Sequence, residues 1–478
     1  MNWDEFVKWG TRISNWAHGY HSSLRERSVR AQVAPGEILE ALPPEPPKLG
    51  VNMETVFADF ERIVMPGITH WQHPRFFAYF PANATPPSML ADYLITVIAP
   101  QCMLWQTSPA ATEMETRMLQ WLRHSLGLAE HFEGVIQDSA SSATLAAVLT
   151  MREKALTWSG NQQGLSSQPT LRVYASDEVH SSVDRAIWIA GIGQENLKRI
   201  PTKGTIRSMD PDALDAAILE DISNGMKPAG IVACVGSTST GGTDDIDALC
   251  NVAEKHRVFV HVDAAWAGAA MICPEFRDIW KGIDRADSIV FNPHKWLGMQ
   301  FDCSAHFLKN PDLLVRTLSI KPEYLKTHGK DGIINYSEWS IPLGRRFRAL
   351  KIWFVLRIYG LEGLQTMIRN HVTWAQELHD LLDKERDFEI ITAPVLSLFT
   401  FRYTPKGVEE LDALNQSLVN AINDDGRIYL TQTRVKDNVV IRFQAGQVDV
   451  TREDVMLAFE VIKEMAATLD LPRLSGPS

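Results

Sequence analysis

A lysine past the middle of the chain stands where its amine could form a covalent bond. Lys295 follows an apolar run and an Asn-Pro turn in the segment FNPHKW, residues 291–296. This order predicts a strand followed by a turn, and active sites of open α/β sheets lie at the carboxyl ends of strands. The apolar neighbours Trp296 and Leu297 would exclude water and favour the neutral amine that forms Schiff bases. Taken alone, a lysine at this position is more often an exposed surface residue.

An aspartate ends a second apolar run, VFVHVDAA, residues 258–265. A buried carboxylate is costly without a partner, so a helix cap or a salt bridge would each explain Asp263 by itself. An aspartate and a lysine on neighbouring strand ends, however, are the pair that pyridoxal 5′-phosphate (PLP) requires. The carboxylate keeps the pyridine nitrogen protonated, and the lysine binds the aldehyde carbon. The small side chain of Ala265 would leave room for the flat ring.

A serine-rich segment precedes a predicted helix and could bind the phosphate of PLP. Ser139, Ala140 and Ser141 come just before the helical stretch 143–152. Hydroxyls and free helix N-terminal amides would then converge on an anion, although such a segment also makes an ordinary helix cap. Asp138 is unfavourable beside a phosphate. We therefore expect its carboxylate to point away or to accept hydrogen bonds from the turn.

A histidine opens another predicted helix, after another strand, in DEVHSS, residues 177–182. In isolation His180 would be a cap or a surface residue. In a PLP site its flat imidazole could stack on the cofactor ring and hydrogen-bond the substrate carboxylate.

The elements between about residues 130 and 310 must position these side chains. Short β-branched runs alternate there with helical stretches such as 244–256. This alternation predicts a mostly parallel α/β sheet buried on both faces by helices. The strand candidates are Leu171–Tyr174, Ile231–Val235, Val258–Val262 and Ser288–Phe291.

The two ends of the chain have other patterns. Residues 2–22 carry an aromatic stripe at helical spacing, and the proline-rich segment that follows is expected to be extended. This arm would pack either on its own domain or over a second subunit. A long helix over 345–370, bent near Gly360, precedes a smaller α+β domain. The domain is predicted from strands at 388–403, 429–435 and 439–443, a helix at 411–423 and a last helix capped by Thr451 and Asp454.

Composition narrows the class of protein. The 478 residues carry a net charge of −11 with a pI near 5.7, which argues against nucleic-acid and anionic-membrane partners. Five scattered cysteines predict neither a disulfide framework nor a metal site, and they favour a cytoplasmic setting. The N-terminus is not of the signal-peptide type, and no apolar run is long enough to span a bilayer.

Several segments, in the same order along the chain, resemble the PLP-dependent group II decarboxylases, and within them the aromatic-L-amino-acid decarboxylases. The likeness extends to about residue 470. The segments are HPRFFAYFP (73–81), SPAATEMETRMLQWL (108–122), DEVHSSVDRA (177–186), HVDAAWAG (261–268), NPHKWLG (292–298) and IPLGRRFRALKIWFVLRIYG (341–360).

The resemblance implies a role for each matching residue. Lys295 would form the aldimine, Asp263 would pair with the pyridine nitrogen, and His180 would stack on the ring opposite Ala265. Tyr324 matches the tyrosine of a mobile catalytic loop, residues 321–332. The phosphate and its surroundings would be bound by Ser139, Ala140, Ser141, Asn292 and His294, with Thr238 near the ring.

The resemblance also implies an architecture. The fold would be the aspartate aminotransferase type (fold type I) of PLP-dependent transferases, in an obligate homodimer with active sites at the subunit interface. Residues 1–85 would be an arm on the partner subunit, 86–350 the large PLP-binding domain and 351–478 the small C-terminal domain.

The implied reaction is decarboxylation of DOPA, tyrosine, phenylalanine, tryptophan or 5-hydroxytryptophan to the arylalkylamine, through an external aldimine and a quinonoid. Two alternatives remain: an aromatic aldehyde synthase, which also deaminates oxidatively, and a PLP-binding homologue without turnover. The presence of both Tyr324 and His180 favours plain decarboxylation. The substrate pocket departs from the animal enzymes at Ala82, Gln101 and Met103, and it has a small residue at Gly344.

Overall fold

The computed structural model describes residues 1–320 and 333–469 and divides them into two compact units. The large unit contains Ala82–Thr373 and Thr392–Phe399. The terminal unit contains Met1–Pro81, Trp374–Ile391 and the described residues from Thr400 onward. No helix in the described part of the chain is both long and apolar enough to cross a membrane.

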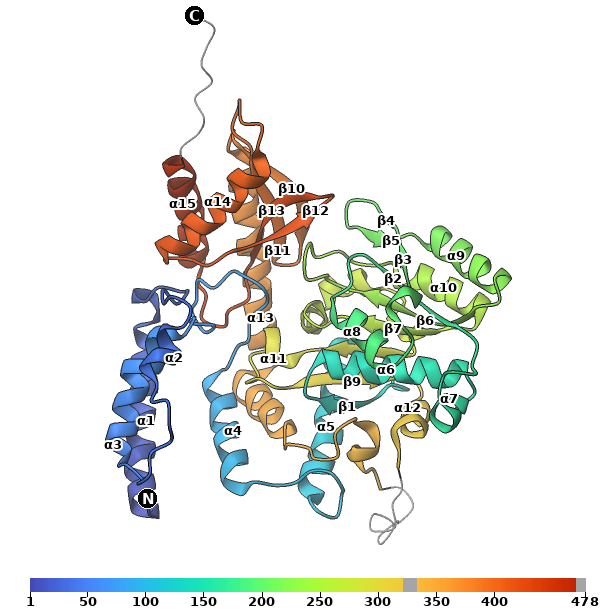
Figure 1. Ribbon diagram of the computed structural model, residues 1–478, viewed down its shortest axis with the longest axis horizontal. Coiled ribbons are helices and arrows are strands. Elements are labelled where there is room, and N and C mark those ends of the chain that lie inside the picture. Colours follow the sequence, from blue (N-terminus) through green and yellow to red (C-terminus); the bar gives the residue numbers. More distant parts are fainter. Residues whose placement is uncertain (321–332, 470–478) are drawn as a thin grey trace, which may run out of the picture. The chain divides into compact units, whose positions relative to one another are not determined.

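A seven-stranded sheet forms the centre of the large unit (Figure 1). Strands β8, β7, β6, β2 and β3 pair in parallel, whereas β9 runs antiparallel between β8 and β1. The mostly parallel sheet predicted from the sequence is therefore confirmed. In sheet order the strands are β1 (Glu133–Gln137), β9 (Ser304–Leu308), β8 (Ser288–Phe291), β7 (Phe259–Asp263), β6 (Lys227–Cys234), β2 (Leu171–Ser176) and β3 (Leu197–Ile200).

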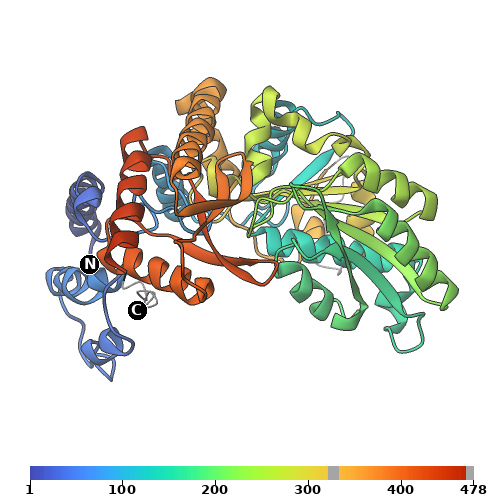
Figure 2. The ribbon, with the colours of Figure 1, turned by 90° about the horizontal axis from the view of Figure 1, so that it is seen from above.

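Helices cover both faces of this sheet, with α6 and α8 on one face and α9 and α10 on the other (Figures 1 and 2). Every residue of β7 and β8 is buried, as expected of strands packed between two helical layers. The helices are α4 (Pro86–Ile98), α5 (Pro109–Leu126), α6 (Ala140–Ala155), α7 (Ser159–Gln163), α8 (Ser182–Ile189), α9 (Pro211–Ser223), α10 (Ile246–His256), α11 (Pro293–Trp296) and α12 (Pro311–Leu318).

The long helix α13 spans Ala349–Lys384 and is interrupted at Gly360, whose φ of 66° and ψ of 170° are not helical. The predicted bend is thus confirmed, but the helix begins four residues later than Arg345, where it was expected. The backbone N–H of Arg345 donates to Gln101 Oε1 at 2.8 Å, and its carbonyl accepts the N–H of Cys102 at 3.0 Å. Because these backbone groups are engaged elsewhere, they are not available to a helical turn.

The terminal unit joins the two ends of the chain. Asp454, in α15, forms ion pairs with Arg25 at 2.7 Å and with Arg75 at 2.9 Å. The predicted capping box of Thr451 and Asp454 is present. The helices are α1 (Trp3–Ser22), α2 (Glu37–Ala41), α3 (Met53–Asp59), α14 (Leu411–Asp425) and α15 (Arg452–Thr468). A four-stranded sheet has the order β10 (Phe388–Val395), β11 (Leu398–Tyr403), β13 (Asn438–Gln444) and β12 (Thr431–Val435).

The N-terminal arm differs from the prediction in one respect. The proline-rich segment is not extended throughout, because α2 forms in the stretch between its prolines. The aromatic stripe of α1 packs on the segment after it: the ring centroids of Trp9 and Phe57 are 5.5 Å apart, and those of Trp16 and Phe60 are 5.3 Å apart. The packing of this arm on a partner subunit stays a prediction.

Buried histidines of the large unit are expected to make the stability of the protein fall in acid. Burial lowers the pKa of His294, His306 and His371 to about 3, and lowers that of His261 well below 6.5. The unfolded chain binds protons at these residues below pH 6.5, whereas the folded chain does not. Their contribution to stability is therefore complete above about pH 6.5 and is lost as the pH falls.

We expect each buried histidine to cost about 1.4 kcal/mol of unfolding free energy per pH unit below 6.5. Urea unfolding of the wild type between pH 7 and pH 5 measures how steeply the unfolding free energy falls with pH. His306→Asn should reduce this slope by the contribution of one histidine. Equal stability of the wild type at the two pH values would contradict this expectation.

Candidate active site

The turn that carries Lys295 is held on several sides. It forms the short helix α11, which begins after β8, and the N–H of Lys295 donates to the carbonyl of Asn292 at 3.0 Å. Asn83 Nδ2 donates to the carbonyl of Lys295 at 2.9 Å. The next residue, Trp296, is fully buried, stacks on Trp266 at 5.1 Å between ring centroids, and donates from Nε1 to His371. The half-buried lysine side chain thus extends from a rigid base.

Asp263 lies at the end of β7, beside β8, as its position in the sequence predicts. Its partner across the parallel pair is Val290, and its side chain is buried. One carboxylate oxygen accepts the N–H of Ala265 at 3.0 Å. The carbonyl of Ala265 in turn accepts the N–H of Asn292 at 2.9 Å. These hydrogen bonds join the ends of β7 and β8, so Asp263 and the turn of Lys295 lie at one edge of the sheet.

His180 lies within electrostatic reach of both groups. Loss of hydration is the main cause that lowers its pKa; the charge of Asp263 opposes this effect and that of Lys295 adds to it. The ring Nδ1 accepts the N–H of Ser182 at 3.1 Å, so a neutral ring carries its proton on Nε2. Part of the side chain is exposed. At neutral pH, His180 is therefore an uncharged imidazole whose Nε2–H can donate a hydrogen bond.

The start of α6 has the features of an anion site. Ser139 is the N-cap, and its Oγ accepts the N–H of Ser142 at 3.2 Å, while the first-turn amides of Ala140 and Ser141 have no helical acceptor. Ser139 Oγ also lies 3.1 Å from Asp138 Oδ1. The expectation that Asp138 accepts a hydrogen bond from the turn is confirmed.

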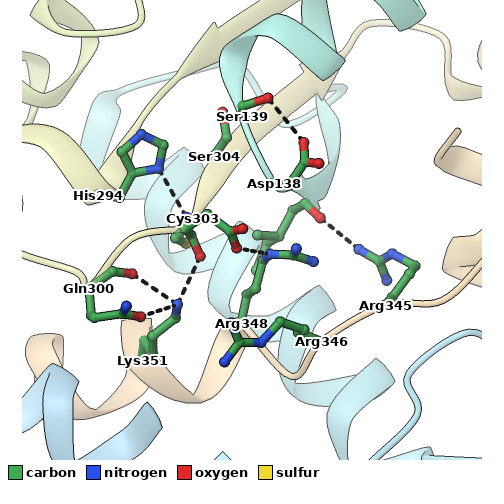
Figure 3. Close-up of polar contacts among 12 residues, drawn as sticks. Asp138, Ser139, His294, Gln300, Cys303, Ser304, Arg345, Arg346, Arg348 and Lys351 are labelled. Carbon is green, nitrogen blue, oxygen red and sulfur yellow. Dashed lines mark hydrogen bonds and ion pairs between the residues drawn. The ribbon is translucent and has the colours of Figure 1, made fainter. Parts of the chain in front are cut away.

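His294 lies near this helix start (Figure 3), and both His294 and Asn292 are buried. His294 Nδ1 accepts the N–H of Cys303 at 2.9 Å, and burial lowers the pKa of His294 to about 3. The ring is thus neutral and keeps Nε2–H as its donor. Ser304 Oγ donates to Asn292 Oδ1 at 2.5 Å, which orients the amide of Asn292.

Basic residues of the segment before and within α13 surround the loop that follows Lys295 (Figure 3). Arg348 Nε donates to Asp302 at 2.6 Å. Burial is the largest single effect and lowers the pKa of Arg348, but this hydrogen bond and the nearby negative charges, that of Asp302 first, together outweigh it and raise the pKa. Lys351 is 1% exposed, and its Nζ donates to the carbonyls of Gln300 and Asp302 at 2.9 and 2.8 Å. These cations stabilise the loop and add positive charge beside His294.

These residues fit PLP. A lysine amine, a buried carboxylate and an uncharged imidazole meet at one sheet edge, and the helix start supplies donors for a phosphate. Ala265 packs with Ala140, Ala143 and Val290, so small side chains separate the helix start from the end of β7. Thr238 is half-buried in the loop after β6.

The four predicted pocket residues lie on three stretches of the chain, and their grouping into one pocket stays a prediction. Ala82 precedes Asn83, which contacts the carbonyl of Lys295. Gln101 instead contacts the segment of Gly344: a Cβ added at Gly344 would lie 3.3 Å from Gln101 Nε2. Met103 accepts the N–H of Ser337 at 3.1 Å through its carbonyl. Tyr324 lies outside the described residues.

Sequence reasoning missed Asn83, Arg348 and Lys351. Asn83 is 212 positions from the lysine whose carbonyl it contacts, so no spacing pattern indicates it. Arg348 and Lys351 lie in the segment 341–360, where the resemblance assigns neither of them a role.

Comparisons with known proteins identify the family. Residues 35–404 match the pyridoxal-dependent decarboxylase conserved domain. Aromatic-L-amino-acid decarboxylase of Mus musculus is 40% identical, over 98% of this chain and 99% of its own length. Phenylacetaldehyde synthase of Arabidopsis thaliana is 36% identical, over 98% and 97%.

A solved structure is also similar. Oryza sativa TDC with PLP and tryptamine has a TM-score of 0.94 and 34% identity, over 98% of both chains. The family model and these similarities show that the chain belongs to the PLP-dependent group II decarboxylases, as a carboxy-lyase of fold type I.

Proposed function

We propose that the protein converts aromatic L-amino acids to arylalkylamines and CO₂. The observation that carries the proposal is the meeting of Lys295, Asp263 and an uncharged His180 at the carboxyl edge of the sheet. Relatives named as aromatic amino acid decarboxylases support the substrate class. The side chain accepted could be that of DOPA, tyrosine, phenylalanine, tryptophan or 5-hydroxytryptophan, and a panel of these acids would rank them.

In the proposed mechanism, Lys295 would hold PLP through its amine and Asp263 would keep the ring nitrogen protonated. When bound, PLP supplies an electron sink for the bond to the departing carboxylate. His180 would lie against the ring and donate Nε2–H to the substrate carboxylate, which would orient the bond that must break. After CO₂ leaves, Tyr324 delivers a proton to Cα, directly or through His180. Lys295 then displaces the amine product.

The main alternative is an aromatic aldehyde synthase, since phenylacetaldehyde synthase is among the similar proteins. Such an enzyme decarboxylates and then lets oxygen complete a deamination. Tyr324 and His180 are both present in this chain, and a proton donor at Cα favours the amine.

Replacing Tyr324 by phenylalanine should shift the product from amine toward aldehyde, ammonia and peroxide. The change removes only the hydroxyl that would protonate Cα, so the carbanionic species would persist long enough to meet oxygen. Amine, aldehyde and oxygen uptake are measured side by side for the wild type and the variant. A variant that makes amine at the wild-type rate without oxygen uptake would exclude Tyr324 as donor. A wild type that makes mainly aldehyde would establish the alternative.

We also propose that the active protein is a homodimer. Helix α4 exposes an apolar stripe at helical spacing: Leu90 is 60% exposed, Val97 54% and Ile98 62%. Trp3 of α1 is 76% exposed. Such surfaces are typical of obligate interfaces, which bury more than about 2,000 Å².

Sedimentation at decreasing concentration should therefore show a dimer, with activity lost where monomers form. Leu90→Glu should move this dissociation to higher concentration. A monomer with full activity would contradict the proposal.

We also propose a reducing, cytoplasmic setting for the protein. The five cysteines are free and buried, which supports this setting.

A further inference from the structure

Three chain segments meet at one buried carboxylate beside the proposed ring site. Glu178 lies in the turn between β2 and α8, two residues before His180, and is 8% exposed. Its Oε2 accepts Ser237 Oγ–H at 2.9 Å and Thr240 Oγ1–H at 2.5 Å. Its Oε1 accepts Arg207 Nε–H. Every polar contact of this carboxylate thus reaches a segment distant in the sequence.

The loop after β6, residues 236–243, is folded around Glu178. Ser237 Oγ, which donates to the carboxylate, accepts the N–H of Gly242 at 2.9 Å. Thr240 Oγ1, which also donates to the carboxylate, accepts the N–H of Gly242 at 3.1 Å. A Cβ added at Gly242 would lie 3.1 Å from Glu178 Oε2, so the loop backbone packs directly on the carboxylate. Thr238 lies between these two anchors.

The third segment is the hairpin of β4 (Thr202–Lys203) and β5 (Ser208–Met209). Arg207 takes a left-handed φ of 52° there, and the ion pair with Glu178 compensates the buried charge. The hairpin is fastened to the same loop, because the carbonyl of Ile206 accepts the N–H of Thr243 at 3.1 Å. Loss of the carboxylate would therefore loosen both the loop and the turn at once.

We propose that Glu178 is a positioning residue, which holds the His180 turn and the Thr238 loop in register at the cofactor ring. The proposal rests on the function proposed above, in which His180 stacks on that ring. A buried, fully satisfied polar network has a single arrangement, so it can set the relative position of two loops. Displacement of a catalytic group by about 1 Å can cost about a hundred-fold in rate.

The first test replaces Glu178 by alanine and compares it with Glu153→Ala. Glu153 is a matched control, because it is also a buried carboxylate of the large unit that pairs with an arginine, Arg152 at 2.9 Å. Both variants should lose stability. Both should still bind PLP. Only Glu178→Ala should lose about a hundred-fold in kcat and change the visible circular dichroism of the bound cofactor.

A second pair of variants keeps the test decisive if Glu178→Ala does not fold. Glu178→Gln retains an acceptor oxygen for the two hydroxyls but turns an amide NH₂ toward Arg207. Two hydrogen-bond donors then face each other. Adding Arg207→Ala removes this conflict. The double variant should therefore recover most of the kcat and dichroism that Glu178→Gln loses, which a general loss of stability would not predict.

The proposal is overturned if kcat and cofactor dichroism are unchanged in the Glu178 variants. It is also overturned if Glu153→Ala alters both as strongly, or if the double variant recovers neither. A wild type that binds PLP but forms no amine from any aromatic amino acid would refute the proposed function instead. The dichroism of the variants would then still report on the register of the two loops.

Discussion

Replacing Lys295 by alanine is expected to abolish covalent attachment of PLP and to lower the decarboxylation rate by about a thousand-fold or more. The variant should still bind PLP, because the donors at the start of α6, His294 and the carboxylate of Asp263 do not depend on the lysine. The fold should also persist, since Asn83 donates to the carbonyl of residue 295, which alanine retains.

Borohydride treatment followed by peptide mapping measures the attachment. In the wild type the label should appear on the peptide that contains Lys295, and in Lys295→Ala on none. Lys309→Ala is the control, because this lysine is exposed and follows β9 in the same unit. A label on a peptide without Lys295 would show that the site assignment is wrong.

Asp263→Asn should lower kcat by about a hundred- to a thousand-fold while the protein keeps its fold and its PLP. Asparagine retains an oxygen that can accept the N–H of Ala265, the bond that Asp263 makes at 3.0 Å. The substitution removes the negative charge, so the pyridine nitrogen is no longer held protonated and the ring withdraws electrons weakly.

Asp287→Asn is the matched control. Asp287 precedes β8 at the opposite edge of the sheet and also accepts a backbone N–H, that of Val260 in β7, at 2.9 Å. Steady-state kinetics and bound PLP are compared for the two variants. Near-normal kcat in Asp263→Asn, or an equal loss in Asp287→Asn, would show that the charge of Asp263 has no special part in the reaction.

The sequence by itself determined the local elements and the type of chemistry. Strands buried on both faces are continuous apolar runs, so β7 and β8 were recognisable, and Asp263 and Lys295 stand just after such runs. Because parallel strands end at one edge, their side chains were expected to meet. The bend at Gly360 and the capping box of α15 also depend on residues a few positions apart.

Only the tertiary structure decided which distant groups complete the site. The contact of Asn83 with Lys295 spans 212 positions, and the contact of Glu178 with Ser237 spans 59. The later start of α13 follows from contacts of Arg345 with a segment more than 200 residues away. Propensity and periodicity act over one or two turns of chain. Burial instead requires each polar group to find whichever partner the fold brings near, so these contacts leave no local pattern in the sequence.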